Sequence, residues 1–157
     1  MTGMQTYGSL APLVRRLQRA SESIKPVIER AAFRLERTIV LHIQNQDLPW
    51  EALSPKYLAR KIKEGFSELI MIRTGTALET VRTIQLDDSS YFVGWPRGVT
   101  RKTADGTVEI YPIMAVKEFG SLDGTEPARP VIQPSLKELK VWLRQQMVDE
   151  LKKAFVS

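Results

Sequence analysis

The sequence predicts an α+β domain with a helix at each end and a small antiparallel sheet with short helices between them. Two segments with apolar residues at helical spacing, near residues 25–45 and 135–155, enclose a middle region of short strands and turns. The 157 residues are the length of one ordinary domain, and 43% hydrophobic residues are enough for a core. We therefore expect a single domain over residues 1–157, with its C-terminal helix packed on the sheet.

The N-terminal helix is predicted from apolar residues at intervals of three and four. One set runs from Leu10 to Leu17 and a longer one from Ile24 to Ile43, with Pro26 between them. A proline inside a helix costs about 3 kcal/mol but is harmless in the first turn. We expect an N-terminal arm over residues 1–23, with a short helix near 9–20, followed by a long helix over 25–45. One long kinked helix is the alternative.

Capping patterns predict two short helices in the middle region. Ser54 followed by Pro55 is typical of a helix start, so a helix is expected to run to about Lys63. Thr76 and Glu79 have the spacing of a capping box, which predicts a helix over about 77–82.

The strands are expected after these helices. Residues 82–87 and 90–95 alternate and contain β-branched and aromatic side chains, and the polar residues 87–90 between them are typical of a hairpin turn. Residues 96–107 are rich in proline, glycine, threonine and basic side chains, which predicts an exposed loop. A strand is expected over 107–111.

The last third of the chain is expected to be mainly helical. Residues 112–119 predict a helical turn closed by Gly120, and residues 128–132 an extended segment. Ser135 and Glu138 form a second capping box, which predicts the start of the C-terminal helix. One apolar stripe follows it: Leu136, Leu139, Leu143, Met147, Leu151 and Phe155.

No catalytic, cofactor-binding or metal-binding residue is predicted. Cysteine is absent, which excludes disulfides and thiolate chemistry. His42 is the only histidine and is expected to be structural or on the surface, while Asp87 and Asp88 are ordinary turn residues. Neither a phosphate-binding loop nor a dinucleotide-binding fingerprint is present. No apolar run approaches the roughly 20 residues needed to cross a membrane.

The net charge of +5 leaves a second class of function open, a small DNA-binding module. Most basic residues have acidic neighbours in the sequence, but the group of Arg97, Arg101 and Lys102 does not. Tyr91 and Trp95 could stack on bases, although strand aromatics usually fill a core or an interface. A small enzyme with an unrecognised site is a third class.

Five short motifs, in order, resemble the phage virion-morphogenesis family, the tail-completion proteins of Mu-like phages. Residues 49–61 (PWEALSPKYLARK) resemble its Trp-x-x-Leu-Ser-Pro signature, and residues 72–78 (IRTGTAL) its Thr-Gly-x-Leu element. Val93-Gly94 is similar to a family strand, residues 117–120 (KEFG) to its His-Glu-Phe-Gly motif, and residues 127–130 (PARP) to its Pro-Ala-Arg-Pro-Phe element. Lys117 stands where the family often has histidine. The minor tail proteins of long-tailed phages share several of these elements.

The resemblance implies a structural virion protein without catalysis, in the neck or tail, that acts in head–tail joining. It would assemble in the host cytoplasm and contact neck, connector or tail-tube proteins. Such a position has rotational symmetry, so we expect a cyclic ring, with six copies favoured and twelve second. The residues carried over as family-motif or interface candidates are Trp50, Leu53, Ser54, Pro55, Lys61, Thr74, Gly75, Leu78, Gly94, Glu118, Phe119, Gly120, Pro127, Arg129 and Pro130.

Physical roles can be assigned to some of these positions. Gly75 and Gly120 are expected where the backbone needs angles that other residues resist. Phe119 is expected to anchor the following segment in the core. Arg129 is expected to pair with Glu118 or to reach a neighbouring subunit.

Overall fold

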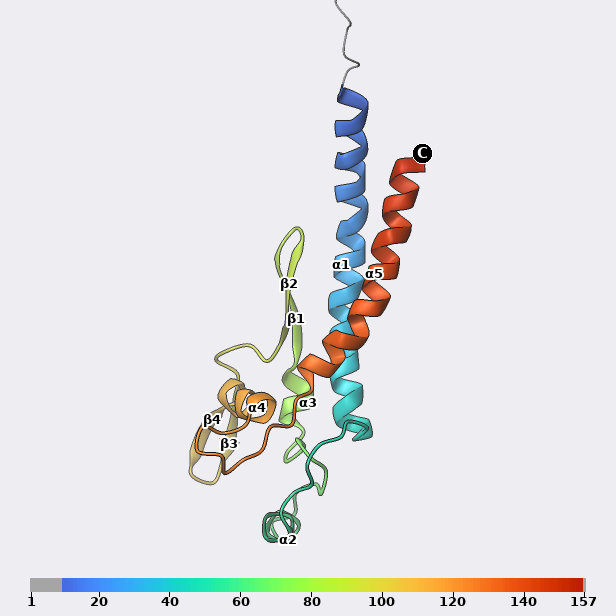
Figure 1. The fold of residues 1–157 in the computed structure, drawn as a ribbon. Coiled ribbons are helices and arrows are strands. Elements are labelled where there is room, and N and C mark those ends of the chain that lie inside the picture. The colour runs from blue at the N-terminus through green and yellow to red at the C-terminus, as the bar shows by residue number, and fades with distance from the viewer. Residues whose placement is uncertain (1–9, 157) are drawn as a thin grey trace, which may run out of the picture.

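The computed structural model describes residues 10–156, and two long helices dominate its shape, α1 (Ala11–Asn45) and α5 (Ile132–Val156). They lie side by side, and the shorter elements gather beside the C-terminal half of α1 (Figure 1). In chain order these are α2 (Pro55–Lys63), α3 (Thr76–Thr80), β1 (Arg82–Asp87), β2 (Ser90–Gly94), β3 (Thr100–Thr103), β4 (Gly106–Glu109) and α4 (Ile110–Phe119). The predicted α+β class, with a helix at each end, is confirmed.

The antiparallel strands form two two-stranded sheets, where the sequence suggested one. β1 pairs with β2 as the predicted hairpin, with Arg82 opposite Gly94. β3 pairs with β4, with Thr100 opposite Glu109. The loop predicted over residues 96–107 is mostly exposed, but much of it is this second hairpin, so its description as a loop is wrong. β3 lacks apolar alternation, so the sequence carries no strand signal there. The strand predicted over residues 107–111 overlaps β4 at residues 107–109, but Ile110 and Tyr111 belong to α4, so its predicted end is wrong.

α1 runs through Pro26 without interruption, so the predicted split near residues 20–25 is wrong. The alternative, one long kinked helix, is confirmed as far as its continuity is concerned. Residues 1–9 of the predicted arm lie outside the described residues, and residues 11–23 belong to α1. Proline removes one helical hydrogen bond. Beyond it, Val27, Ala31 and Leu35 are buried and α1 packs along α5, so tertiary packing offsets the local cost.

α2 and α3 differ in how well their starts are predicted. The Ser54 hydroxyl oxygen accepts a hydrogen bond from the Tyr57 backbone N–H at 3.3 Å, which confirms the cap of α2. α3 begins at Thr76 itself, with Gly75 as the N-cap and no side-chain cap, so the predicted capping box is wrong. The Thr76 hydroxyl lies 2.9 Å from that of Thr74 instead.

One hydrophobic core joins the long helices to the middle region. α1 contributes residues at the predicted spacing, among them Leu35, Ile39 and Ile43. The other elements contribute Val81, Trp95, Ile110, Met114, Val131 and Leu139. The Trp95 indole N–H donates to the Ala77 carbonyl oxygen at 2.7 Å, so this aromatic belongs to the core. Since Leu139 of α5 belongs to the same buried cluster as Trp95 and Val81, the C-terminal helix packs on the middle region as well as on α1.

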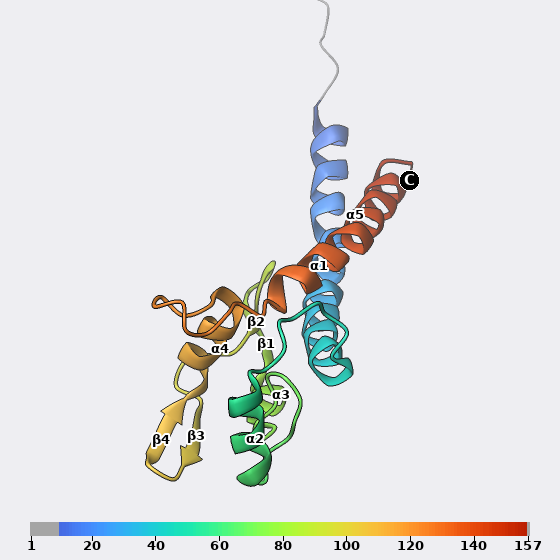
Figure 2. The same cartoon turned by 60° about the horizontal axis from the view of Figure 1, so that its bottom comes forward.

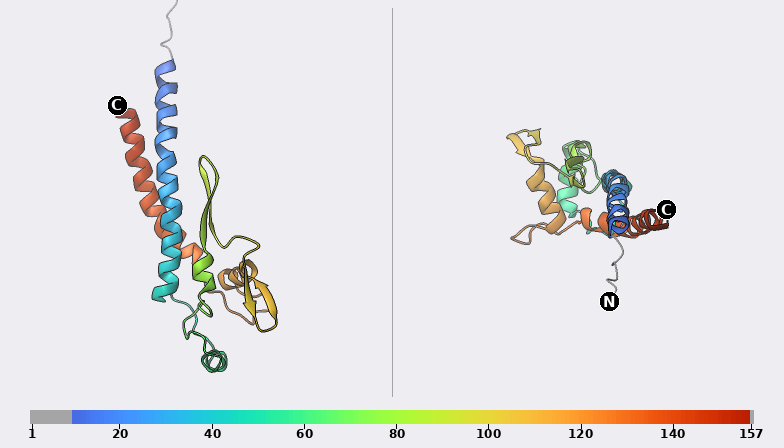
Figure 3. Two further views of the ribbon diagram at one scale, coloured as in Figure 1. Left: turned by 180° about the vertical axis from the view of Figure 1, so that it is seen from behind. Right: turned by 90° about the horizontal axis from the view of Figure 1, so that it is seen from above.

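The N-terminal end of α1 extends beyond this core. Residues 10–19, which we name the arm helix, are exposed at every position, and Ala20 is the first buried residue. Figure 2 and Figure 3 show α5 crossing α1 and diverging from it towards its own C-terminal end. The arm helix carries four exposed apolar side chains at helical spacing: Leu10, Leu13, Val14 and Leu17. No described helix is long and apolar enough to span a membrane.

Candidate functional site

Glu118, near the end of α4, caps the N-terminus of α5. Its carboxylate accepts hydrogen bonds from the backbone N–H groups of Val131 at 2.8 Å, Ile132 at 3.0 Å and Gln133 at 3.0 Å. These donors have no partner within the helix, and the positive end of the helix dipole also favours a carboxylate there. Glu118 is only 5% exposed, so the three bonds compensate for burying its charge.

This cap explains why the predicted capping box of Ser135 and Glu138 is wrong. α5 begins at Ile132, three residues before Ser135. The Ser135 hydroxyl lies inside the first turn and donates to the Val131 carbonyl oxygen at 2.7 Å. A carboxylate from α4 performs the capping, and no local pattern around Ser135 reports it.

Arg129 and Trp50 tie the segment before α5 to the segment before α2. The Arg129 guanidinium donates from Nε to the Glu51 carbonyl oxygen at 2.8 Å and from Nη2 to that of Ala52 at 3.3 Å. The Trp50 indole N–H donates to the Pro130 carbonyl oxygen at 2.8 Å. Arg129 is 4% exposed and its guanidinium donates to these backbone carbonyls, so the expected pairing with Glu118 is wrong. A contact between Arg129 and a neighbouring subunit stays a prediction.

Gly120 ends α4 where the chain returns towards α5. Its φ of +81° lies in the left-handed region, and a Cβ atom there would lie 3.2 Å from the backbone N of Ala128 and from the carbonyl oxygen of Glu126. The segment that returns towards α5 is held by the Arg129 backbone N–H, which donates to the Lys117 carbonyl oxygen at 2.6 Å. The expectation that Gly120 supplies a special backbone conformation is confirmed.

Lys61 holds the loop between α2 and α3 in place by hydrogen bonds to its backbone, as Arg129 does for the segment before α2. Its buried ammonium group donates to the carbonyl oxygens of Leu69 at 2.5 Å and Ile72 at 2.6 Å. Burial, followed by the nearby positive charge of Arg73, lowers the pKa of Lys61. The following Gly75 has a φ of +83°, as expected for a glycine that turns the chain into α3.

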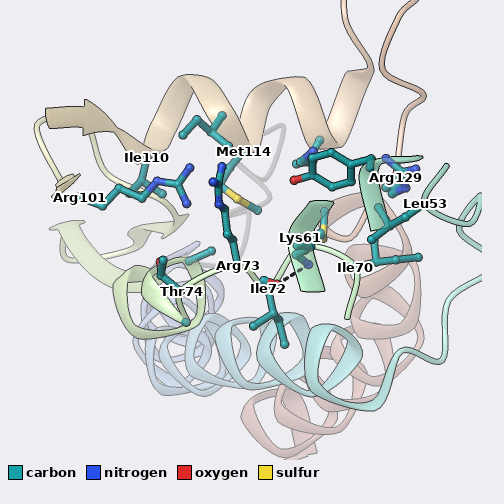
Figure 4. Close-up of a pocket in the computed structure, with 16 residues that line it drawn as sticks. Leu53, Lys61, Ile70, Ile72, Arg73, Thr74, Arg101, Ile110, Met114 and Arg129 are labelled. Atoms are coloured by element: carbon teal, nitrogen blue, oxygen red, sulfur yellow. Dashed lines mark hydrogen bonds between the residues drawn. The ribbon is translucent and has the colours of Figure 1, made fainter. Parts of the chain in front are cut away.

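Between these elements lies a pocket of about 110 Å³, which we name the basic pocket (Figure 4). Five cationic side chains line it: Lys61, Arg73, Arg101, Lys117 and Arg129. They come from α2, the loop before α3, β3, α4 and the segment before α5.

The pKa of Lys117 reflects the positive charge and the burial around it in the basic pocket. Burial, helped by the positive charges of Arg129, Lys61 and Arg101, lowers the pKa of Lys117 to about 8. The ion pair with Glu126, at the edge of the pocket, does not offset this. The pocket is therefore an environment in which positive charge exceeds the available negative charge.

The structure brings most of the predicted motif residues together around the start of α5 and the basic pocket. Trp50, Glu118, Gly120, Arg129 and Pro130 belong to the framework described above, Pro127 precedes it, and Lys61, Leu53, Thr74 and Gly75 line the pocket. Ser54 and Pro55 begin α2, Leu78 packs against the core and the buried Gly94 ends β2. A role for these residues at a subunit interface remains a prediction.

Phe119 is the clear exception. It is 73% exposed, so the expectation that it anchors the chain in the core is wrong. It directly follows the buried Glu118 on α4, and neighbouring residues of a helix point in different directions. Orienting the Glu118 carboxylate towards α5 therefore leaves Phe119 outside the core.

His42 is a buried structural residue. Its Nδ1 lies 2.7 Å from an Asp47 carboxylate oxygen, while its Nε2 lies 3.1 Å from Glu138 but outside hydrogen-bond geometry. Among residues 10–156, no group of three or more acidic or histidine side chains is arranged to hold a metal ion.

Sequence reasoning did not select Arg73, Arg101 or Lys117 as site residues. A signal for Arg101 existed, because its basic group has no acidic neighbours in the sequence. Lys117 stands out in the sequence only because the family motif often has histidine at that position. Nothing local marks Arg73, which enters the pocket because Lys61 holds its loop in place.

The comparisons with known proteins add one relative. The uncharacterized protein MJ0331 of Methanocaldococcus jannaschii is 34% identical over 97 residues, which are 62% of this chain and 64% of that protein. The match thus spans less than two thirds of either chain. No family model and no solved structure matches this chain.

Proposed function

We propose that the protein is a structural subunit of a tailed-bacteriophage virion, in the neck or at tail completion. It would act in head–tail joining as one copy of a ring, without catalysis. The sequence resemblance supports this, and so does the way in which its motifs meet: Trp50, Glu118 and Arg129 come from three separate motifs and join one hydrogen-bonded framework.

The main support for self-assembly is the exposed apolar face of the arm helix. Helices in proteins gain most of their stability by burying an apolar face, and the arm helix is a part of α1 that buries none within the described chain. Leu13, Val14 and Leu17 are exposed, and the nearest buried position of α1 is Ala20. In a ring the arm helix of one subunit would pack on a different surface of the next, a heterologous contact that closes under rotational symmetry.

The test is light scattering behind size-exclusion chromatography at several concentrations, followed by electron microscopy. We expect rings, with six copies favoured and twelve second. The double variant Leu13→Ser/Leu17→Ser removes the apolar face and should be a folded monomer. The control Arg15→Gln/Arg19→Gln changes the opposite face of the same helix and should still form rings.

A DNA-binding module is the second candidate, favoured by the arginines of the arm helix, Arg15, Arg16 and Arg19. It predicts duplex binding that weakens steeply with salt. A chain that stays monomeric at every concentration, and whose Arg15→Gln/Arg19→Gln variant loses duplex binding, would contradict the ring and support this candidate.

A further inference from the structure

The basic pocket contains more positive charge than the described residues neutralise. Its lining has five cations and, within residues 10–156, no aspartate or glutamate. Two of the cations have carboxylate partners outside the lining: Arg73 pairs with Glu64 at 2.9 Å, and Lys117 pairs with Glu126. Buried charges are costly unless they are paired, so this composition favours a bound anion.

Arg101 provides the strongest single indication of an anion site. Its Nε is buried and, among the described residues, has no hydrogen-bond partner. Figure 4 shows the Arg101 and Arg73 guanidinium groups pointing towards each other beside Met114. Both groups stay charged at any ordinary pH, so they repel each other unless an anion lies between them.

The size of the pocket limits the ligand. About 10 to 15 Å³ of such cavity volume is enough for one water molecule, so a pocket of about 110 Å³ holds several water-sized groups. Pockets for drug-sized molecules start at roughly 300 Å³. A single small oxyanion fits this space, and a base or a nucleotide does not.

The arrangement of the cations favours a tetrahedral anion over a planar carboxylate. The charged groups reach the pocket from five separate chain segments. A phosphate group presents oxygens in several directions, and each guanidinium can bind two of them in a fork.

We propose that the basic pocket binds one phosphate group, with Arg101 and Arg73 as its principal ligands and Lys61, Lys117 and Arg129 providing further positive charge. Wider grooves adjoin the pocket, one beside Lys117 and one beside Lys102. The phosphate is therefore either free inorganic phosphate or one group of a nucleic-acid backbone that follows these grooves. This site is independent of the proposed virion function.

The experiment is a calorimetric titration of the full chain with inorganic phosphate at constant ionic strength. We expect saturable binding of one phosphate per chain, and Arg101→Gln should weaken it roughly tenfold or more, because a charged hydrogen-bond donor is lost. Lys152→Gln is the control, since Lys152 is exposed near the end of α5, away from the pocket and its grooves, and the change removes the same charge. It should leave the affinity within about twofold, as a distant exposed charge does.

A second arm identifies the source of the phosphate group. A short single-stranded oligothymidylate that binds in competition with phosphate assigns the site to a nucleic-acid backbone. Phosphate binding without oligonucleotide binding assigns it to the free ion. Equal weakening by Arg101→Gln and Lys152→Gln, or the absence of saturable binding, would overturn the proposal.

Thermal unfolding of the unaltered protein keeps the test independent of the variants. A ligand that binds only the folded state raises the midpoint of unfolding. Phosphate should therefore raise it more than chloride does at the same ionic strength. An equal rise with both anions would contradict a specific site.

Discussion

The start of α5 and the start of α1 are both helix N-termini, and they differ in how much apolar surface the described residues leave exposed there. At the start of α5, the Glu118 carboxylate satisfies three backbone donors, and the charge that does so is buried. At the start of α1, four apolar side chains face solvent. A helix end completed within the chain serves the fold, whereas one left with unused apolar surface is available to another molecule.

The largest expected effect is on the free energy of unfolding, and it compares the buried part of α1 with its exposed arm helix. Ile39 is fully buried in the core, so Ile39→Ala should lower the free energy of unfolding by roughly 4 kcal/mol through lost burial and a cavity. Leu17→Ala in the arm helix should change it by less than about 0.5 kcal/mol. Chemical denaturation of the two variants measures both values. A comparable loss for Leu17→Ala in the monomer would mean that the arm helix packs within its own chain.

The next effect concerns the cap of α5. Glu118→Ala should lower the free energy of unfolding by roughly 3 kcal/mol, because three N–H groups lose a charged acceptor in a buried place. Glu68→Ala, which removes an exposed carboxylate, is the control and should be nearly neutral. Hydrogen exchange should also accelerate at Ile132 and Gln133. Unchanged exchange there would show that the cap does not hold the helix start.

The smallest effect separates backbone strain from close packing at two glycines with nearly the same φ. Gly98→Ala introduces a side chain at φ +80° with nothing within 4 Å, and should cost about 1 kcal/mol. Gly120→Ala adds contacts at 3.2 Å with the returning backbone and should cost about 2 kcal/mol. Equal losses in thermal or chemical unfolding would mean that the returning segment is not packed against Gly120.

Local features were predictable wherever a few neighbouring residues decide the conformation. The cap of α2 by Ser54, the β1–β2 hairpin and the end of α4 at Gly120 all follow the sequence pattern. The pairing of β3 with β4 was not predicted, because β3 consists of threonine and basic residues and lacks the alternation that marks a buried face, although a strand overlapping β4 was expected.

The basic pocket could not be predicted as a site, because its cations come from five segments that lie near one another only after folding. A charge in the sequence does not report which carbonyl, carboxylate or cation it will meet. Lys61 illustrates this: its motif position was recognised, but its two carbonyl acceptors lie in a loop whose path the sequence did not show.

The sequence by itself determined the α+β class, the helix at each end and the core-facing stripe of α1, because apolar periodicity is a local property that survives folding. Only the tertiary structure decided that α1 continues through Pro26, that Glu118 starts α5 and that Phe119 lies outside the core. Those outcomes depend on contacts between distant segments, whose energies exceed the local preferences of about 1 to 3 kcal/mol that a sequence pattern expresses.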